Sequence, residues 1–221
     1  MQPWTVEYGT LWAAETKGDL RPLYPARVGV VFAEASPSDG LALTGAMNLS
    51  DPQPIQQRFQ SHRRCFTLRV ADHIISYGWV THGTECVGEF ERQFRFHDDE
   101  AYIWDCATVP AWRGRGCYSA LLSHILHQLQ AEGMPRVWIG ASRLNQPSVK
   151  GFVNAGFQPV VDATYRRFYR LTWLWIHPKL AVTRPLVGHA YRILLNDHER
   201  RFGRLALGYK RKRNNPQIVA A

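Results

Sequence analysis

Residues 108–122, TVPAWRGRGCYSALL, contain the end of a strand, a glycine-rich arginine loop and the start of a helix. Gly114 and Gly116 let the backbone bend tightly and approach a ligand with no Cβ in the way. The first N–H groups of the helix that follows have no partner inside that helix. Together with the helix dipole and the charges of Arg113 and Arg115, these donors favour a pyrophosphate. The stretch therefore predicts a phosphate-binding junction between a strand and a helix.

The residues on either side of this loop predict a strand, a helix and a second strand. Residues 101–109 lead into the loop as a strand, and after it apolar side chains recur at helical spacing until Gly133: Leu121, Leu122, Ile125, Leu126 and Leu129. Residues 136–141 form the next strand, and because it follows a crossover helix we expect it to run parallel to the first. A short helix then begins near Asn145 and ends at Gly156, since glycine suits a left-handed terminal position.

Strand and helix signals also precede and follow this unit. Helices are expected to start at residues 36–37 and 51–52, where a serine or aspartate stands before proline. The strand-like segments are 27–34, the hairpin arms 65–71 and 74–81, the alternating run 86–96, and one or two closing strands within 160–176. This order predicts an α/β fold with a mixed sheet flanked by helices.

Length and composition limit the class of protein. A chain of 221 residues with 45% hydrophobic and 20% charged residues is typical of one globular domain with extensions. Residues 1–15 do not resemble a signal peptide, and no run is long and apolar enough for a membrane span, so we expect a cytoplasmic protein. The four cysteines lack CxxC spacing, which indicates free thiols and no metal site.

Charge is distributed unevenly along the chain. Residues 166–221 carry a formal charge of +11, whereas residues 1–165 carry −2. The basic end mixes arginines with apolar residues, so it could contact an acidic carrier protein, an anionic membrane or a nucleic acid. The alternative is that these arginines form an ordinary solvated surface, and the sequence leaves both interpretations open.

The loop and its neighbours resemble the GCN5-related N-acetyltransferases (GNAT), which share an Arg/Gln-x-x-Gly-x-Gly/Ala motif between a strand and a helix. Here the motif reads RGRGCY over residues 113–118. A Val-Pro pair before it, a Leu-Leu pair after it, and Asn145 ahead of Gly156-Phe157 occur in the order typical of that family. The resemblance covers residues 27–165, which leaves residues 1–26 as an N-terminal extension and residues 166–221 as a basic C-terminal extension.

The resemblance implies a mostly antiparallel sheet with one splayed parallel pair at the site of an acyl-CoA, most simply acetyl-CoA. Backbone N–H groups from Gly114 through Ser119 would bind the CoA diphosphate, with added charge from Arg113 and Arg115. The strand before the loop would present its backbone to the pantetheine arm, and the next helix would form the opposite wall. The residues implied in these two roles are Ala107, Thr108 and Val109 on the strand, and Asn145, Ser148 and Phe152 on the helix.

Two residues depart from the family pattern. Tyr118 stands where the motif ends in a small residue, and its hydroxyl could serve as a proton donor beside the cofactor. Phe152 occupies the position where many relatives place a tyrosine as general acid, and phenylalanine cannot donate that proton. The resemblance therefore predicts N-acyl transfer from CoA to a small-molecule, peptide or protein amine, by direct attack. The alternatives are a carrier-bound acyl donor and a non-catalytic binding module.

The general base is predicted among carboxylates. Asp105 lies in an apolar segment of the strand that enters the loop, where burial would raise the pKa of its carboxyl group, although a structural ion pair with an arginine explains the position equally well. Glu91, with Glu89 on the same strand face, is the second choice. Cys117 at the helix start favours a lowered thiol pKa, but no triad partner can be assigned to it.

Overall fold

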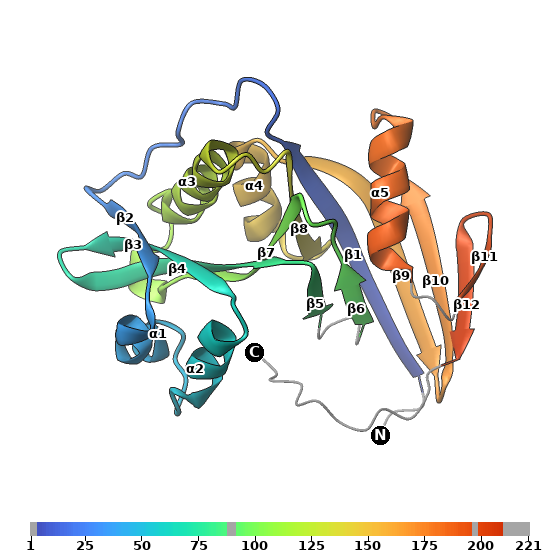
Figure 1. Ribbon diagram of the computed structural model, residues 1–221, viewed down its shortest axis with the longest axis horizontal. Helices are drawn as coiled ribbons and strands as arrows, with labels where there is room; N and C mark the ends of the chain where they lie inside the picture. Colours follow the sequence, from blue (N-terminus) through green and yellow to red (C-terminus); the bar gives the residue numbers. More distant parts are fainter. Residues whose placement is uncertain (1–3, 88–91, 196–198, 210–221) are drawn as a thin grey trace.

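In a computed structural model of the chain, which describes residues 4–87, 92–195 and 199–209, one large sheet organises the molecule (Figure 1). Ten strands are hydrogen-bonded in the order β11-β12-β10-β9-β1-β8-β7-β4-β3-β2, and β5 pairs with β6. In chain order the strands and α-helices are β1 (Trp4–Glu15), β2 (Val31–Ala35), α1 (Gly40–Ala46), α2 (Gln53–Gln60), β3 (Arg64–Val70), β4 (His73–His82), β5 (Thr84–Val87), β6 (Arg92–Arg95), β7 (Glu100–Thr108), α3 (Cys117–Ala131), β8 (Arg136–Ser142), α4 (Gln146–Ala155), β9 (Gln158–Phe168), β10 (Leu171–Pro178), α5 (Arg184–Leu194), β11 (Arg200–Phe202) and β12 (Leu205–Tyr209).

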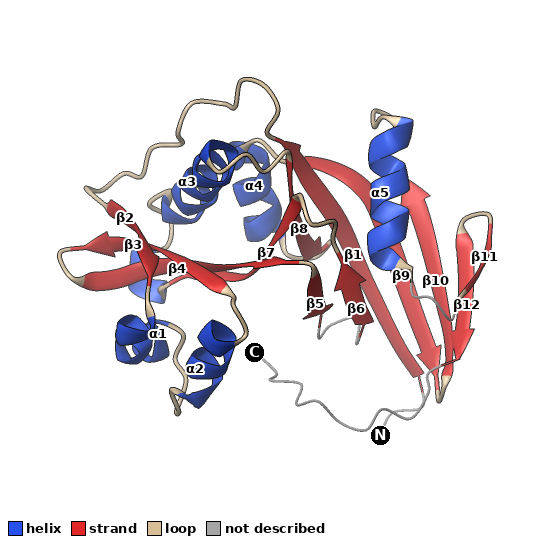
Figure 2. Ribbon diagram, viewed as in Figure 1, coloured by secondary structure: helices blue, strands red, loops and turns tan. Residues whose placement is uncertain are grey.

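Helices cover both faces of the sheet (Figure 2). Helices α3 and α4 pack on one face, and α1, α2 and α5 pack on the other, because successive side chains of a strand point to opposite faces. On β7, for example, Ile103 belongs to the core under α3, whereas Tyr102 belongs to the core under α5. The sheet therefore separates two sets of packed helices.

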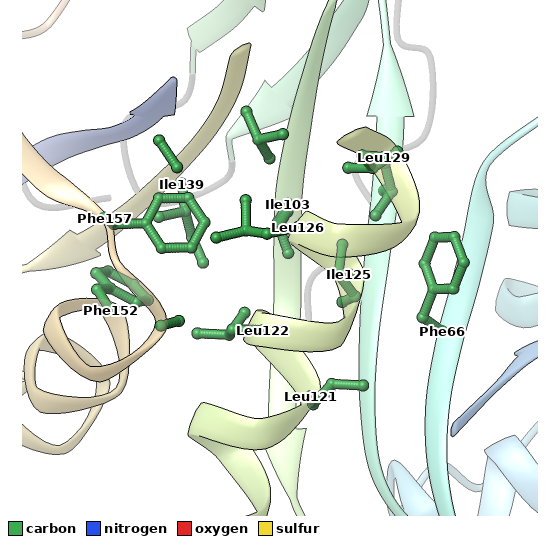
Figure 3. Packing of buried hydrophobic residues seen from close by; sticks show 14 of the residues in the cluster. Phe66, Ile103, Leu121, Leu122, Ile125, Leu126, Leu129, Ile139, Phe152 and Phe157 are labelled. Carbon is green, nitrogen blue, oxygen red and sulfur yellow. The ribbon is translucent and has the colours of Figure 1, made fainter. Parts of the chain in front are cut away.

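Helix α3 is held by its apolar stripe, as its sequence period predicts. Leu121, Leu122, Ile125 and Leu129 are fully buried, and they meet Ile103 of β7, Ile139 of β8 and Phe157 in one cluster (Figure 3). Burying one such side chain stabilises the fold by about 1.5–3 kcal/mol. This packing fixes the start of α3, and with it the preceding loop, relative to β7.

Strands β7 and β8 form the parallel pair, and they separate partway along. Their register runs from Glu100 opposite Arg136 to Ile103 opposite Ile139, and the pairing ends there although β7 continues to Thr108. Just beyond that point, a bulge places Asp105 and its neighbour in β7 opposite a single residue of β4, and Asp105 adopts a left-handed φ of 42°. The second half of β7 thus leaves β8 and opens one wall of the sheet.

The structure confirms the predicted fold class, a mixed and mostly antiparallel sheet with a splayed parallel pair. It also confirms the hairpin of β3 and β4, the strand before the loop, α3, the parallel β8 and the end of α4 at Gly156, whose φ is 103°. Residues 160–176 fall in two strands, β9 and β10.

Two sequence-based expectations differ from the structure. The run 86–96 is not one strand, because its described parts pair with each other as the antiparallel arms β5 and β6. In addition, residues 1–26 were expected to be an extension, yet β1 lies inside the sheet between β8 and β9. Residues 166–209 likewise continue the sheet through β10, β12 and β11. One sheet therefore runs through all three predicted segments.

Candidate active site

A cavity of about 600 Å³ lies where the end of β7 meets the first turns of α3 and α4. The backbone of the loop 113–116 forms its rim, and its walls carry both cationic and hydroxyl side chains. Its lining residues are Tyr24, Arg27, Cys106, Ala107, Thr108, Trp112, Arg113, Gly114, Gly116, Cys117, Tyr118, Ser119, Asn145, Pro147, Ser148, Lys150, Gly151 and Asn154. Most of the residues predicted from the loop and its neighbours are therefore brought together here.

The start of α3 faces this cavity without a side-chain cap. Gly116 is the N-cap residue with a left-handed φ of 78°, and Gly114 has a φ of 76°. The first N–H that bonds back into the helix is that of Ala120, which donates to the Gly116 carbonyl at 2.9 Å. The N–H groups of residues 117–119 precede that bond, so they remain available to a ligand. Because the helix dipole adds positive potential at the same place, the arrangement suits an anion.

A segment that sequence analysis did not assign to the site closes over the loop. The N–H of Arg27 donates to the Arg115 carbonyl at 2.8 Å, and the N–H of Tyr24 donates to Ser123 Oγ at 3.1 Å. A Cβ on Gly116 would lie 3.1 Å from the carbonyl oxygen of Pro25. Glycine is thus required at position 116 by both its φ and this close approach, and the segment brings Tyr24 and Arg27 into the cavity wall.

The charged groups at the cavity are partly those predicted. Arg113 lines it and donates from Nε to the Thr108 carbonyl at 3.2 Å, so its guanidinium is anchored to the end of β7. Arg115 is absent from the described lining and instead stacks on Trp112, with its guanidinium carbon 4.9 Å from the ring centre. Arg27 and Lys150, which no motif singled out, supply the other cationic side chains of the wall. The cavity therefore suits a ligand with several negative charges.

The strand and helix that flank the loop contribute as expected, with one exception. Ala107 and Thr108 line the cavity, whereas the N–H of Val109 donates to the Ile75 carbonyl of β4 at 2.9 Å and Val109 lies outside the described lining. Asn145 and Ser148 line the opposite wall, and Asn145 Oδ1 accepts the N–H of Ser148 at 3.2 Å. The Asn145 side chain therefore caps α4 as well as lining the cavity.

Tyr118 and Phe152 are the two residues that depart from the family pattern. Tyr118 stands where the pattern has a small residue, and Phe152 stands where many relatives have a tyrosine. The Tyr118 ring lies against Gly151 so closely that a Cβ there would be 2.3 Å from its Cδ1. Burial raises the pKa of its hydroxyl above the ordinary value, and the nearby Ser148 side chain opposes that rise. Phe152, predicted to lie at the cofactor, is fully buried beside Phe157 and Leu122 (Figure 3) and lies outside the described lining of the cavity. Of the two helices, α3 and not α4 thus brings a phenol to the cavity, beside that of Tyr24 from the segment before β2.

Asp105 lies away from the cavity, on the face of the sheet that carries α2. Its Oδ2 accepts from Arg58 Nη1 at 2.6 Å, and the Arg58 guanidinium stacks between Trp79 and Trp104 at 5.0 and 4.6 Å from their ring centres. The carboxylate is therefore engaged in the ion pair that was the structural alternative for this position. Glu91 and Glu89 lie outside the described residues.

Cys117 and the two histidines of α3, His124 and His127, lie in structural surroundings. Burial raises the pKa of the Cys117 thiol, the opposite of what its place at a helix start favours. His124 stacks on Phe32, and the Nε2 atom of His127 is 2.9 Å from the Arg21 carbonyl. Within the described ranges no three His, Cys, Asp or Glu side chains gather in a way that could hold a metal ion. None of the helices that the structure describes is long and apolar enough to cross a membrane.

Comparison with known proteins agrees with this geometry. A family model described as the acetyltransferase (GNAT) family matches residues 41–157. Among curated proteins, the [ribosomal protein bS18]-alanine N-acetyltransferase of Haemophilus ducreyi is 31% identical over 71 residues, which are 32% of this chain and 47% of that protein. The enzyme of the same name from Escherichia coli K12 is 30% identical over 71 residues, or 32% and 46% of the two chains. The chain thus spans about half the length of the curated relatives that it matches.

Solved structures share the fold at low sequence identity. A GCN5-related N-acetyltransferase from Sphaerobacter thermophilus has a TM-score of 0.54 at 17% identity, covering 73% of this chain and 51% of its own. A GCN5-related glucosamine N-acetyltransferase region of a fungal multi-domain GH3 β-N-acetylglucosaminidase has a TM-score of 0.55 at 13% identity, covering 74% and 21%. These likenesses concern the arrangement of the sheet and its helices.

Proposed function

The chain belongs to the acetyltransferase (GNAT) family, and we propose that it transfers an acetyl or related acyl group from a CoA thioester to an amine by direct attack. The single observation that carries this proposal is the uncapped start of α3, which faces a cavity lined by Arg27, Arg113 and Lys150. A CoA diphosphate needs backbone donors and cations in one place, and this cavity offers both. The acyl-CoA supplies the activated acyl group, and the protein supplies binding, orientation and protons.

Each wall of the cavity has a separate task in this proposal. The N–H groups of residues 117–119 bind phosphate oxygens, and Arg113, held at the end of β7, adds a planar charged donor beside them. Ala107 and Thr108 align the pantetheine arm along the part of β7 that has left β8. Asn145 and Ser148 confine it from the start of α4. Holding the thioester in one orientation lowers the entropic part of the barrier to attack.

Tyr118 is the proton donor in this proposal. Tyr118 lines the cavity, and a phenol is protonated at neutral pH, so it has a proton to give as a general acid. Phe152 cannot take that role, because its side chain lacks a proton to give and is buried in the core. The amine nitrogen attacks the thioester carbon, and as the C–S bond breaks Tyr118 donates its proton to the departing sulfur. The proton that the amine loses returns to the Tyr118 phenolate through water.

For the acceptor, we propose the amine of a peptide or protein. The support is the likeness to two enzymes whose names specify the alanine of a ribosomal protein. A small-molecule amine is the alternative acceptor that the same assay examines.

The test is an assay of thiol release with acetyl-CoA and a panel of peptide and small-molecule amines. We expect release that depends on the acceptor and is lost in Gly116→Trp, because an indole at this left-handed position would collide with Pro25 and block the start of α3. Gly188→Trp is the matched control, since nothing lies within 4 Å of a Cβ at that position on α5. Binding of CoA with no turnover across the panel would overturn the enzyme assignment in favour of a binding module.

A further inference from the structure

Strands β1, β9, β10, β12 and β11 lie side by side beyond the cavity, and α5 covers one face of them (Figure 1). The side chains under α5 include Tyr165, Leu174 and Ala206, which are buried. The residues that alternate with these belong to none of the three described core clusters. Trp12 and Ala14 of β1 pack with α3 and α4 on the opposite face. The rest of that face, from residues 6–10 of β1 across β9, β10, β12 and β11, lies outside the described clusters, and we call it the outer face.

The strand registers align the outer face into two rows. The first row crosses the five strands as Tyr8, Thr164, Trp175, Leu205 and Phe202. The second row crosses them as Val6, Arg166, Trp173, Leu207 and Arg200. Because neighbouring strands are about 4.8 Å apart, successive aromatic residues of the first row, two strands apart, are separated by roughly 10 Å. A line of rings thus runs beside a line that contains two arginines.

Several members of these rows are open to solvent. Tyr8 is 46% exposed and Phe202 is 59% exposed, which is high for large apolar side chains on strands. Arg166 and Arg200 are also exposed, and the Arg166 guanidinium lies 5.4 Å from the ring centre of Trp175 in the first row. Cations and aromatic rings therefore alternate on one surface.

The charge of the outer face is positive. Among the described residues of the five strands, Asp162 is the acidic residue that shares this face, and its carboxylate already accepts from Thr10 at 2.7 Å and from Lys179 at 2.7 Å. A second copy of the chain would set Arg166 and Arg200 against a surface with the same charges, which disfavours self-association. The partner must therefore be anionic and must also offer flat groups that stack on rings.

We propose that the outer face binds single-stranded RNA, with bases stacked on Tyr8, Trp175 and Phe202 and phosphates paired with Arg166 and Arg200. Unpaired bases present π-faces that any aromatic side chain can stack on, and arginines follow the phosphate backbone. A sheet surface with spaced rings suits an extended strand, whereas a duplex keeps its bases stacked on one another. This inference does not depend on the acyl-transfer activity.

The test is fluorescence anisotropy of the full chain with a labelled oligo(U) RNA at several salt concentrations. We expect Tyr8→Ala and Phe202→Ala each to weaken binding by roughly 10-fold, the usual cost of losing one stacking ring. The double variant Arg166→Ala/Arg200→Ala should reduce the salt slope of log Kobs by roughly 0.7 per arginine. The control Arg184→Ala/Arg192→Ala removes the same charge from exposed positions on α5 and should leave binding unchanged.

Other outcomes overturn the proposal. Equal competition by inorganic polyphosphate, or wild-type affinity in both ring variants, would mean that the surface recognises charge alone. Equal affinity for duplex RNA would exclude base stacking. Binding to phosphatidylserine vesicles or to poly-glutamate without binding to oligo(U) would assign the face to a membrane or to an acidic protein. Melting temperatures of the variants, measured beside wild type, separate lost binding from lost folding. Phe202→Ala should disturb the fold less than Tyr8→Ala, because Phe202 lies on the short strand β11.

Discussion

Helices α3 and α4 both begin at the cavity, and their first turns are completed in different ways. At α4, the Asn145 side chain accepts the N–H of Ser148, so the helix satisfies its own terminal donor. At α3, the N-cap is Gly116, which has no side chain to accept anything, and its left-handed φ turns the N–H groups of the first turn toward the cavity. The first turn of α4 is thus completed by its own sequence, whereas the first turn of α3 leaves its N–H groups for a ligand to complete. Tyr118 links the two helix starts, since it belongs to the first turn of α3 and its ring packs against Gly151 of α4.

The largest effect is expected where the two helix starts meet. Tyr118→Phe removes the hydroxyl and keeps the ring, so we expect kcat to fall by about 100-fold or more while the affinity for CoA stays near wild type. Burial raises the pKa of Tyr118, so the phenol stays neutral and the kcat profile of the wild type should show no loss from its ionisation below about pH 10. Steady-state kinetics across pH, with calorimetric titration of CoA, measure both. An unchanged kcat would remove Tyr118 from the proton transfer.

The next largest effect, on stability, is expected at Gly116, the N-cap of α3 without a capping side chain. Gly116→Ala combines a strained left-handed φ with a Cβ 3.1 Å from the Pro25 carbonyl, so we expect unfolding free energy to fall by about 3 kcal/mol. Gly114→Ala is the matched control, because it has a similar φ but nothing within 4 Å of its Cβ. Chemical denaturation should therefore find Gly116→Ala the less stable of the two. Equal losses would mean that φ alone sets the requirement for glycine.

A smaller effect is expected on the α4 side of the contact. In Gly151→Ala the new Cβ overlaps the Tyr118 ring, which must move, and we expect a loss of about 2 kcal/mol in unfolding free energy. Gly188→Ala, a helical glycine with open space around it, should instead gain roughly 0.5–1 kcal/mol. A stable Gly151→Ala protein with full activity would contradict the placement of the Tyr118 ring.

The smallest effect is expected at the capped start of α4. Asn145→Ala removes the acceptor for the Ser148 N–H, and we expect a loss of about 1 kcal/mol in unfolding free energy. Asn145→Asp keeps an acceptor oxygen and should retain most of that stability. If thermal denaturation finds no difference between Asn145→Ala and wild type, the cap contributes nothing and the contrast between the two helices fails.

Local signals in the sequence predicted the elements around the site. The period of Leu122, Leu126 and Leu129 predicted α3, and the glycines of the loop predicted its left-handed turns, because both depend on neighbouring residues alone. The position of β1 was not predicted, since its hydrogen-bond partners in β8 and β9 are far away in the sequence and no turn connects them to it. The alternating pattern of the run 86–96 favours one strand, and the single Gly88 did not outweigh it as a sign of a turn between β5 and β6.

The same distinction applies to the site. Arg113, Gly116, Ala107 and Asn145 belong to a motif or stand beside one, and the structure brings them to the cavity. Arg27 reaches it through a backbone bond to Arg115, a long-range contact that has no local signature. Phe152 and Asp105 were placed by their sequence positions, but the direction of a side chain depends on the packing around it, which buries Phe152 and pairs Asp105 with Arg58.

The central place of β1 has a consequence for how the chain reaches its folded state. These residues are hydrogen-bonded between β8 and β9, residues 136–142 and 158–168, which lie far from them along the chain. Closing loops of this length carries an entropic cost before any contact repays it, so sheets that depend on distant pairings form slowly. We therefore expect the insertion of β1 between β8 and β9 to be a late step in the folding of the sheet.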